Sequence, residues 1–415
     1  MKKYYQKSIN LILITVFIFT ACASTTISGM QIARADDKNE DEPITEAFFK
    51  NNDAVEVNKI TGELKIPEIN AQSAIVIDKK TKRVLFEKDA YSKRNIASTT
   101  KIITCIVALE NSKMDDVVTI SRKAADVWGS DIKLKAGQKF TMRELLYGLM
   151  LKSGNDAAMA IAEQVGGSEE GFVSMMNKKA KEIGAENTSF SNPHGLDEDG
   201  HYSTAYDMAI ITAYALENND FSIIVSTKQI NFPSLSLANT NEMLTIYPNA
   251  DGVKTGYTGI AGRCLVTSAN YEDMKLISVV LNCATREKRA LSSKTILEYA
   301  SKKYHMRVLL KKGDVIGDIP VIKGRKEIVT VKAANDIAMP LSDDEVSKIE
   351  KKVRLDDVFH APLDNRQKMG TVSFTAGDMN IGTVDIETDE SVEKKSFMDF
   401  MIQILESLAN LVRGS

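Results

Sequence analysis

The 415-residue chain has few of the residues that mark several protein classes. Its four cysteines include no Cys-x-x-Cys pair, which argues against a structural zinc site. Only four histidines are present, and the two that lie close together, His194 and His201, lack the spacing of a helical ligand pair, so we expect structural roles for them. Lysine and arginine total 53 against 56 acidic residues, so no basic surface is expected and nucleic acid is not an expected partner.

The cysteine count also argues against a disulfide framework. Beyond Cys22, the chain has only Cys105, Cys264 and Cys283, an odd number, and each lies in an apolar run. We therefore predict that these three are buried free thiols.

The apolar run near the N-terminus, residues 11–19, is too short for a comfortable membrane span. It follows a lysine-rich start and precedes small-residue motifs, so we predict a signal peptide over 1–35 with cleavage after Ala35. An alternative is a lipoprotein signal with Cys22 lipidated. Either reading predicts export to the outer face of the cytoplasmic membrane, in the cell envelope. Residues 36–66 are acidic and polar and are predicted to form a linker.

Strand and helix patterns alternate along the next part of the chain. Residues 74–87 predict a β-hairpin. Helical periodicity dominates from about 120 to 220, where Thr141 is a plausible N-cap. Residues 263–269 and 275–281 predict strands of an antiparallel sheet.

A serine and a lysine three residues apart stand at the head of an apolar run. Ser98 and Lys101 precede residues 102–109, a predicted buried helix, so their side chains would be neighbours. A partly desolvated lysine favours its neutral form and can take the proton that makes serine a poor nucleophile. The same spacing recurs at Ser130 and Ser391, where no apolar helix follows, and there we interpret it as ordinary surface.

Two further motifs follow in the chain. Ser153 and Asn155 flank a glycine in a turn between two apolar helices, where an ordinary reading is helix capping. Lys254, Thr255 and Gly256 lie on a predicted strand. A glycine lets a ligand approach a strand closely, and a lysine and threonine beside it can hold a carboxylate, although a solvated lysine before a turn is the ordinary reading.

The three motifs occur in the order found in penicillin-binding proteins and class A β-lactamases. The chain resembles the low-molecular-mass penicillin-binding proteins that are serine D-alanyl-D-alanine carboxypeptidases, over residues 67–390. The residues that carry the resemblance are 96–101, 152–156, 192–196, 206–209 and 251–256.

The resemblance implies a fold class and a domain order. The fold would be α+β, with a β-lactamase/DD-peptidase-like domain over 67–305, an antiparallel sheet flanked by helices and carrying a helical subdomain. A small all-β domain would follow over 306–390. Residues 391–415 would form an amphipathic membrane-anchoring helix.

The resemblance also implies the catalytic residues. Ser98 would be the acylated nucleophile and Lys101 its base. Ser153 would relay a proton to the leaving D-alanine. The backbone N–H groups of Ser98 and Tyr257 would form the oxyanion hole, where losing one donor typically costs about 10²–10³ in rate.

Substrate binding would fall to a second set of residues: Asn155, Lys254, Thr255, Thr258 and Arg289. Asn155 would hold the substrate's peptide carbonyl or side chain, and the others would bind the terminal carboxylate. Arg286 lies close enough in sequence to leave the arginine assignment open. Residues 127–133 are expected to border the site.

The implied reaction removes the terminal D-alanine from peptidoglycan stem peptides in cell wall biogenesis, without a metal or organic cofactor. Penicillins, which are β-lactam antibiotics, would acylate the same serine. A class A β-lactamase would need Glu-x-x-Leu-Asn between Asn155 and Lys254, and no such string exists. A wall-binding module with a dead site is a second alternative, although all catalytic residue types are present.

The last stretch is apolar except for one narrow polar stripe at helical spacing. Residues 397–412 contain phenylalanine, methionine, leucine, isoleucine and valine, interrupted every three or four residues by polar side chains. This pattern predicts a helix that lies in the membrane interface. A helix docked on its own protein is the alternative.

Overall fold

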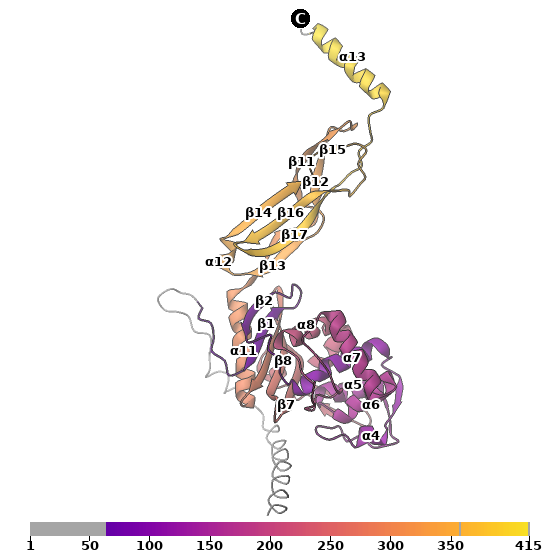
Figure 1. Cartoon of the computed structure of the whole chain (residues 1–415), viewed down its shortest axis with the longest axis vertical. Helices are drawn as coiled ribbons and strands as arrows, with labels where there is room; N and C mark the ends of the chain where they lie inside the picture. The colour runs from indigo at the N-terminus through magenta and orange to yellow at the C-terminus, as the bar shows by residue number, and fades with distance from the viewer. Residues whose placement is uncertain (1–63, 357, 414–415) are drawn as a thin grey trace, which may run out of the picture. The chain divides into compact units, whose positions relative to one another are not determined.

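The computed structural model describes residues 64–356 and 358–413, so the predicted signal peptide and nearly all of the predicted linker lie outside the described residues. The described chain forms two compact units (Figure 1). The first comprises 64–77, 86–270 and 276–298. The second comprises 78–85, 271–275 and the chain from 299 onward.

A five-stranded sheet in the order β2-β1-β9-β8-β7 forms the centre of the first unit. Its strands are β1 (Ser73–Asp78), β2 (Val84–Lys88), β7 (Ala250–Thr258), β8 (Gly262–Tyr271) and β9 (Met274–Cys283). β7 and β8 are antiparallel, with Lys254 opposite Val266. β8 and β9 each contain six consecutive buried residues, which is typical of strands covered on both faces.

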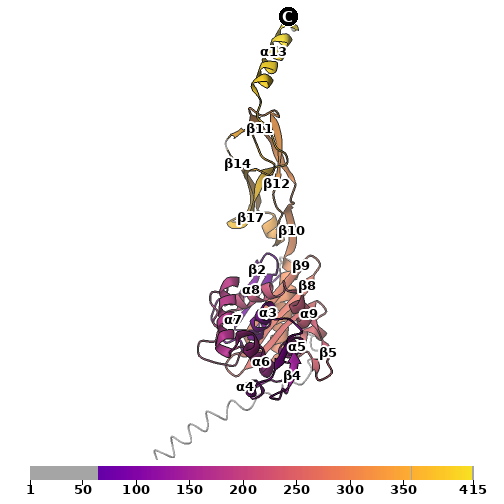
Figure 2. The ribbon, with the colours of Figure 1, turned by 90° about the vertical axis from the view of Figure 1, so that its right-hand side faces the viewer.

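Helices lie on either side of this sheet, with α11 on one side and α5 to α8 on the other (Figures 1 and 2). The helical elements are η3 (Ala97–Thr100), α3 (Lys101–Asn111), α4 (Arg122–Ala125), α5 (Met142–Leu151), α6 (Asn155–Gly166), α7 (Glu169–Ile183), α8 (Ala205–Ala215), α9 (Asn219–Ser226), α10 (Met243–Ile246) and α11 (Arg286–Lys303). Two small strand pairs join β3 (Val117–Thr119) to β4 (Lys139–Thr141) and β5 (Gln229–Asn231) to β6 (Ser236–Ala238).

The predicted N-cap at Thr141 is confirmed. Its side chain accepts a hydrogen bond from the Glu144 backbone at 3.3 Å, and the Glu144 carboxylate accepts one from the Thr141 backbone at 2.7 Å. This reciprocal pair satisfies two backbone donors that a helix start leaves unpaired. It fixes where α5 begins, and α5 leads directly into the turn that carries Ser153.

The second unit contains a six-stranded sheet in the order β14-β16-β17-β12-β11-β15 and a separate pair, β10 with β13. The elements are β10 (His305–Leu310), β11 (Val315–Ile322), β12 (Ile328–Ala333), β13 (Ile337–Leu341), α12 (Asp343–Val346), β14 (Ile349–Leu355), β15 (Phe359–His360), β16 (Lys368–Ala376) and β17 (Met379–Thr388).

The core of this second unit is apolar. Buried and half-buried residues alternate along β16, so one face packs inward and the other meets solvent. Val372 and Phe374 from β16 join Val329 and Val331 from β12 in the core. Gly370 is required where β16 bulges, because a Cβ there would lie 2.1 Å from the Arg354 carbonyl oxygen.

The last helix, α13 (Phe397–Arg413), carries its apolar side chains on the surface. The exposed residues include Phe397, Met398, Ile402, Ile404, Leu405 and Leu408. Within the described residues, no helix is both long and apolar enough to cross a membrane.

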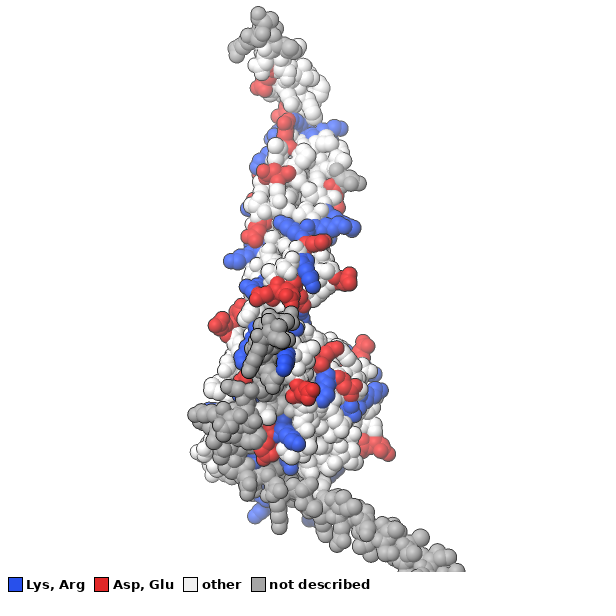
Figure 3. Space-filling model, turned by 90° about the vertical axis from the view of Figure 1, so that its left-hand side faces the viewer, with Lys and Arg blue, Asp and Glu red and all other residues white. Residues whose placement is uncertain are grey.

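Positive and negative side chains are interspersed on the face of the molecule in Figure 3. This agrees with the formal net charge of −3.

Most of the fold predictions are confirmed. The hairpin, the helical region, the antiparallel pairing and the strands after residue 306 all form, so the fold class is α+β. The thiols of Cys105, Cys264 and Cys283 are buried and free, as predicted.

Candidate active site

Ser98 lies in the 3₁₀ turn η3, and the predicted buried helix α3 begins only at Lys101. In a 3₁₀ turn the side chains of residues three apart are eclipsed, which brings Ser98 beside Lys101. The turn starts from a strained position, because Ala97 has a φ of 47°. Ser98 is partly exposed, whereas Ala97 and Thr99 are buried, so the serine hydroxyl can be reached by a ligand.

The Lys101 side chain is fully buried at the centre of the site. Its Nζ lies 3.0 Å from Ser98 Oγ. It also lies 2.7 Å from Asn155 Oδ1 and 2.7 Å from the His194 carbonyl oxygen. One nitrogen therefore connects the first two sequence motifs.

Burial lowers the pKa of Lys101 well below its usual value, because the charged form loses its hydration. The nearby Lys254 charge lowers the pKa further, and the Asp156 carboxylate opposes the shift. The Asp156 pKa is itself raised by burial, although the backbone N–H groups of Ile132 and Leu134 bond to it. The site thus favours a neutral amine beside the serine.

Asn155 begins α6 and is held by the segment expected to border the site. Its Nδ2 donates to the Trp128 carbonyl at 2.7 Å, and its backbone N–H donates to the Ser130 carbonyl at 2.7 Å. A Cβ on Gly129 would lie 2.6 Å from Asn155 Nδ2, so only glycine fits there. Both ends of the Asn155 amide therefore bond to the protein, with Lys101 at one and Trp128 at the other.

Ser153 is buried in the turn between α5 and α6, with a left-handed φ of 62°. This conformation is uncommon for a residue with a side chain and marks a tight reversal of the chain. Since Asn155 contacts Lys101, the turn brings Ser153 into the same region as the first motif.

The strand β7 lies against η3, which brings the third motif to the first. A Cβ on Gly256 would lie 3.0 Å from the Ser98 nitrogen and 3.1 Å from the Thr99 nitrogen. The glycine therefore permits this close approach. Lys254 is buried, and its Nζ donates to the Thr255 carbonyl at 2.8 Å.

The side chains of Thr255 and Thr258 on β7 form hydrogen bonds within the protein. Thr255 Oγ1 lies 3.3 Å from Thr240 Oγ1. Thr258 Oγ1 donates to Asp197 at 2.9 Å and accepts from the Ala261 backbone at 3.0 Å, which fixes the turn into β8.

Tyr257, whose backbone is the second expected oxyanion donor, follows Gly256 on β7. Its ring lies under the Arg263 guanidinium at 4.5 Å.

Arg289 on α11 is buried and pairs with a residue that the sequence analysis missed. Its Nη2 lies 2.6 Å from Glu242 Oε1. Arg286 Nε lies 3.8 Å from the same oxygen, so both candidate arginines approach one carboxylate. Glu242 belongs to no motif and precedes the short helix α10, so its position in the sequence gave no signal.

The loop with the two histidines clamps the turn that holds Ser98. His201 Nδ1 accepts from the Ser191 backbone at 3.0 Å, so its proton is on Nε2, which donates to Thr100 Oγ1 at 2.8 Å. Thr100 Oγ1 in turn donates to the Ala97 carbonyl at 2.8 Å. These hydrogen bonds agree with the structural roles predicted for the two histidines. The sequence alone could not show that His201 supports the turn that carries Ser98.

The two histidines are held neutral. Burial, and then the positive charge of Lys101 in its protonated form, lower the pKa of His201 to about 4. The same two causes, in the same order, lower the pKa of His194 to about 3, with a smaller contribution from His201.

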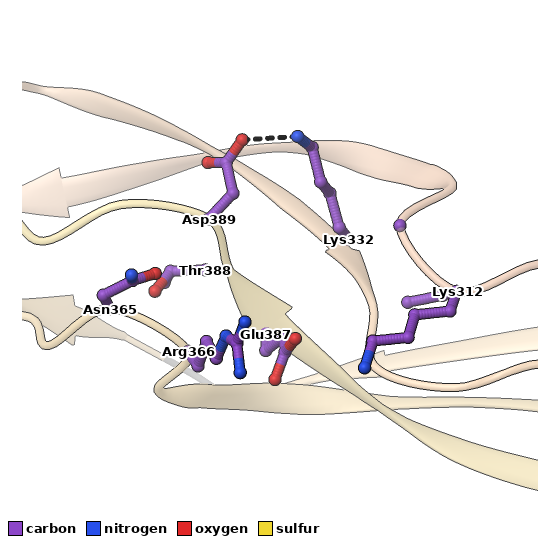
Figure 4. A pocket seen from close by; sticks show the side chains of 9 residues that line it. Lys312, Lys332, Asn365, Arg366, Glu387, Thr388 and Asp389 are labelled. Atoms are coloured by element: carbon purple, nitrogen blue, oxygen red, sulfur yellow. Dashed lines mark ion pairs between the residues drawn. The ribbon is translucent and has the colours of Figure 1, made fainter.

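A separate hollow of about 220 Å³ lies in the second unit, and Figure 4 shows its side chains. Lys332 and Asp389 form an ion pair of 2.6 Å at its edge. It is lined by none of the predicted site residues. Among the described residues, no group of three or more His, Cys, Asp or Glu side chains is arranged to hold a metal ion.

Comparison with known proteins identifies the family. A family model described as D-alanyl-D-alanine carboxypeptidase matches residues 60–285, more than half of the chain. The chain belongs to this family. A second model, described as the C-terminal domain of penicillin-binding protein 5, matches residues 304–394.

Curated relatives and solved structures agree with this membership. The chain is 35% identical over 342 residues to D-alanyl-D-alanine carboxypeptidase DacF of Bacillus subtilis, covering 80% of this chain and 88% of that protein. It is 32% identical over 378 residues to DacA of Escherichia coli, covering 87% and 93%. The crystal structure of penicillin-binding protein 5 from Haemophilus influenzae matches with a TM-score of 0.70 and 31% identity, covering 80% of this chain and all of that one.

The predicted family, fold class and enzyme class are therefore confirmed. This carboxypeptidase is a serine peptidase of cell wall synthesis, with peptidoglycan as its substrate and β-lactams as ligands. Its homologues of the penicillin-binding protein 5 type act on peptidoglycan in the cell envelope.

Proposed function

We propose that Ser98 is the nucleophile of this carboxypeptidase and that neutral Lys101 is its general base. One observation carries the proposal: the three contacts of Lys101 Nζ match a neutral amine. Such an amine has two N–H donors and one lone pair. The two contacts of 2.7 Å are to oxygens that only accept, on Asn155 and His194. The third partner, Ser98 Oγ, is the one that can donate its proton to the lone pair.

Acylation follows from this arrangement. Ser98 Oγ attacks the carbonyl carbon of the penultimate D-alanine while its proton passes to Lys101 Nζ. The carbonyl oxygen becomes an oxyanion, which accepts hydrogen bonds from the backbone N–H groups of Ser98 and Tyr257. The C–N bond then breaks, and the proton reaches the leaving D-alanine amine through Ser153. Water hydrolyses the resulting ester and restores the free serine.

The substrate's terminal carboxylate would bind at β7 and α11. Lys254 and Arg289 supply positive charge, and Thr255 and Thr258 supply hydroxyl groups. Asn155 would hold a substrate peptide group, sharing its amide with Lys101 and Trp128. The support is that Lys254 is buried while close enough to lower the pKa of Lys101 by its charge.

The test is D-alanine release from diacetyl-Lys-D-Ala-D-Ala, together with covalent labelling by penicillin. Wild type should release D-alanine and be labelled, and Ser98→Ala should do neither. The chain offers a matched control in Ser391→Ala, because Ser391 and Lys394 repeat the spacing in the second unit. Labelling that persists in Ser98→Ala would refute the assignment of Ser98 as the nucleophile. Rapid release of hydrolysed penicillin would instead indicate a β-lactamase.

The domain boundaries remain part of the proposal. The catalytic domain would span 67–305, the small β domain 306–390 and the anchor 391–415. The first 35 residues would be removed as a signal peptide during export, with 36–66 as a linker. N-terminal sequencing of the mature protein tests this, because a start at residue 36 is expected and a lipid-modified Cys22 would contradict it.

The C-terminal helix would hold the enzyme on the membrane surface. In α13 the exposed side chains of Ile404, Leu405 and Leu408 present apolar area that water solvates poorly. A helix of this kind gains by burying its apolar face in the headgroup region. Deleting residues 394–415 should release the protein from membranes without loss of activity on soluble peptide. Retention on membranes after the deletion would refute the anchor.

A further inference from the structure

We propose that Glu242 sets how strongly this site binds the C-terminal carboxylate of its ligands, by acting as a built-in counterion of Arg289. The inference rests on the proposed role of Arg289 in carboxylate binding. It adds a residue that belongs to none of the three motifs. Glu242 would be a specificity-determining residue, since it acts on substrate through the arginine.

The first support is the contact itself. Glu242 Oε1 lies 2.6 Å from Arg289 Nη2 and 3.8 Å from Arg286 Nε. The shorter of these two contacts is a charge-assisted hydrogen bond of the kind that a substrate carboxylate would form with a guanidinium. Glu242 therefore occupies part of the donor set that the ligand would use.

The second support is the neighbourhood. Glu242 comes two residues after Thr240, whose hydroxyl lies 3.3 Å from the Thr255 hydroxyl on β7. The short segment 240–242 thus connects the carboxylate-binding strand to the arginine on α11. A change of charge at Glu242 would therefore alter the electrostatic potential both at strand β7 and at Arg289.

The third support is burial and charge. The side chains of Glu242 and Arg289 are only 5% and 2% exposed, so water screens their interaction weakly. Arg286, Arg289 and Glu242 together carry a formal charge of +1. An incoming carboxylate therefore meets a positive cluster weakened by one internal negative charge.

Two opposing effects follow. In the free enzyme Glu242 offsets the cost of burying the Arg289 charge, since an unpaired buried charge is strongly unfavourable. In the complex the same carboxylate repels the ligand's carboxylate. Its net effect is to weaken binding of every ligand with a terminal carboxylate, including penicillin, and to leave ligands without one unaffected.

The experiment compares two ester substrates, diacetyl-Lys-D-Ala-D-lactate and its methyl ester, which lacks the free carboxylate. In Glu242→Gln, kcat/KM for the free acid should rise about five- to tenfold through a lower KM, because a like charge has been removed. The value for the methyl ester should stay within about twofold. Introduced into Arg289→Gln, the same change should give a clearly smaller gain, since the part of the effect that depends on the Arg289 donors is missing.

Glu345→Gln is the matched control, because it removes another glutamate paired with an arginine, Arg83, in the second unit. This variant should leave kcat/KM unchanged for both substrates. If Glu242→Gln does not fold, Glu242→Asp carries the test. It shortens the side chain by one methylene and should give a gain of about twofold on the free acid alone.

Equal losses on both substrates would overturn the proposal and make Glu242 merely structural. A gain of the same size in the Arg289→Gln background would also overturn it, because Glu242 would then not act through the arginine. Wild-type enzyme inactive on both esters and unlabelled by penicillin would overturn the proposed active site along with it. An active wild type with an unchanged ratio of the two substrates would overturn the role of Glu242 alone.

Discussion

The two units of this carboxypeptidase use charge and histidine in opposite ways. The first unit fully buries Lys101, Lys254 and Arg289, which are among the largest buried side chains of the described chain. The core of the second unit is apolar, and ion pairs such as Lys368 with Asp385 lie on its surface. Buried charges are costly and do little for stability, so their concentration in one unit marks it as the site of chemistry.

The four histidines repeat the contrast. His194 and His201 in the first unit are buried and bonded into the loop beside the nucleophile. His305 and His360 in the second unit are exposed. The first unit therefore buries polar side chains at positions where their hydrogen bonds can hold neighbouring groups of the site in place.

The sharpest way to test this contrast is to remove the buried amine. Lys101→Met should lower the rate of acylation by penicillin about 10²–10⁴-fold, the usual contribution of a general base. It should change the melting temperature little, because the cost of leaving the acceptors on Asn155 and His194 unpaired is offset by the avoided cost of desolvating an amine. A variant that keeps its acylation rate would show that another group is the base.

Acid should destabilise the first unit through its two histidines. The pKa values in the folded protein, about 4 for His201 and about 3 for His194, lie below the ordinary histidine value of 6.5. The unfolded chain therefore binds protons first as pH falls. The stabilising contribution is complete above pH 6.5 and is lost towards pH 4 for His201 and towards pH 3 for His194, at up to about 1.4 kcal/mol per pH unit for each histidine.

Urea unfolding at several pH values, followed by the fluorescence of Trp128, the only tryptophan of the chain, measures this slope in the first unit. His201→Gln should flatten it, and His305→Gln should not. An equal slope in all three proteins would mean that carboxylates, and not the buried histidines, set the acid sensitivity.

Removing methyl groups should destabilise the second unit more in its core than at its surface. Val372 is fully buried on β16, and it is paired across the strands with Val353 on β14, which is 42% exposed. Val372→Ala should destabilise this unit by about 2 kcal/mol, and Val353→Ala by well under half of that. Chemical denaturation followed by far-UV circular dichroism measures both, and penicillin acylation should be unchanged. Equal costs would contradict the burial difference between Val372 and Val353, which lies on the edge strand β14.

The smallest effect should come from a surface pair of the second unit. Lys368 Nζ lies 2.7 Å from Asp385, with both side chains at least half exposed. Lys368→Ala should change the free energy of unfolding by no more than about 1 kcal/mol, and less in high salt. A much larger loss in thermal melting would show that surface pairs of this unit act as a network.

The sequence alone determined the parts that depend on local pattern. Alternation and helical periodicity predicted the hairpin, the α5 start at Thr141 and the strands of the sheet, because these depend on neighbours two to four residues away. The order of the three motifs carried the family resemblance. These features need no knowledge of which distant segments meet.

Tertiary structure decided what surrounds the motifs. The turn η3 sets Ser98 beside Lys101, and only the folded chain brings the His194 carbonyl to the same amine. The pairing of Glu242 with Arg289 joins residues on different elements and has no periodic signature. Such contacts depend on which buried polar groups must satisfy one another, and burial is a property of the whole fold.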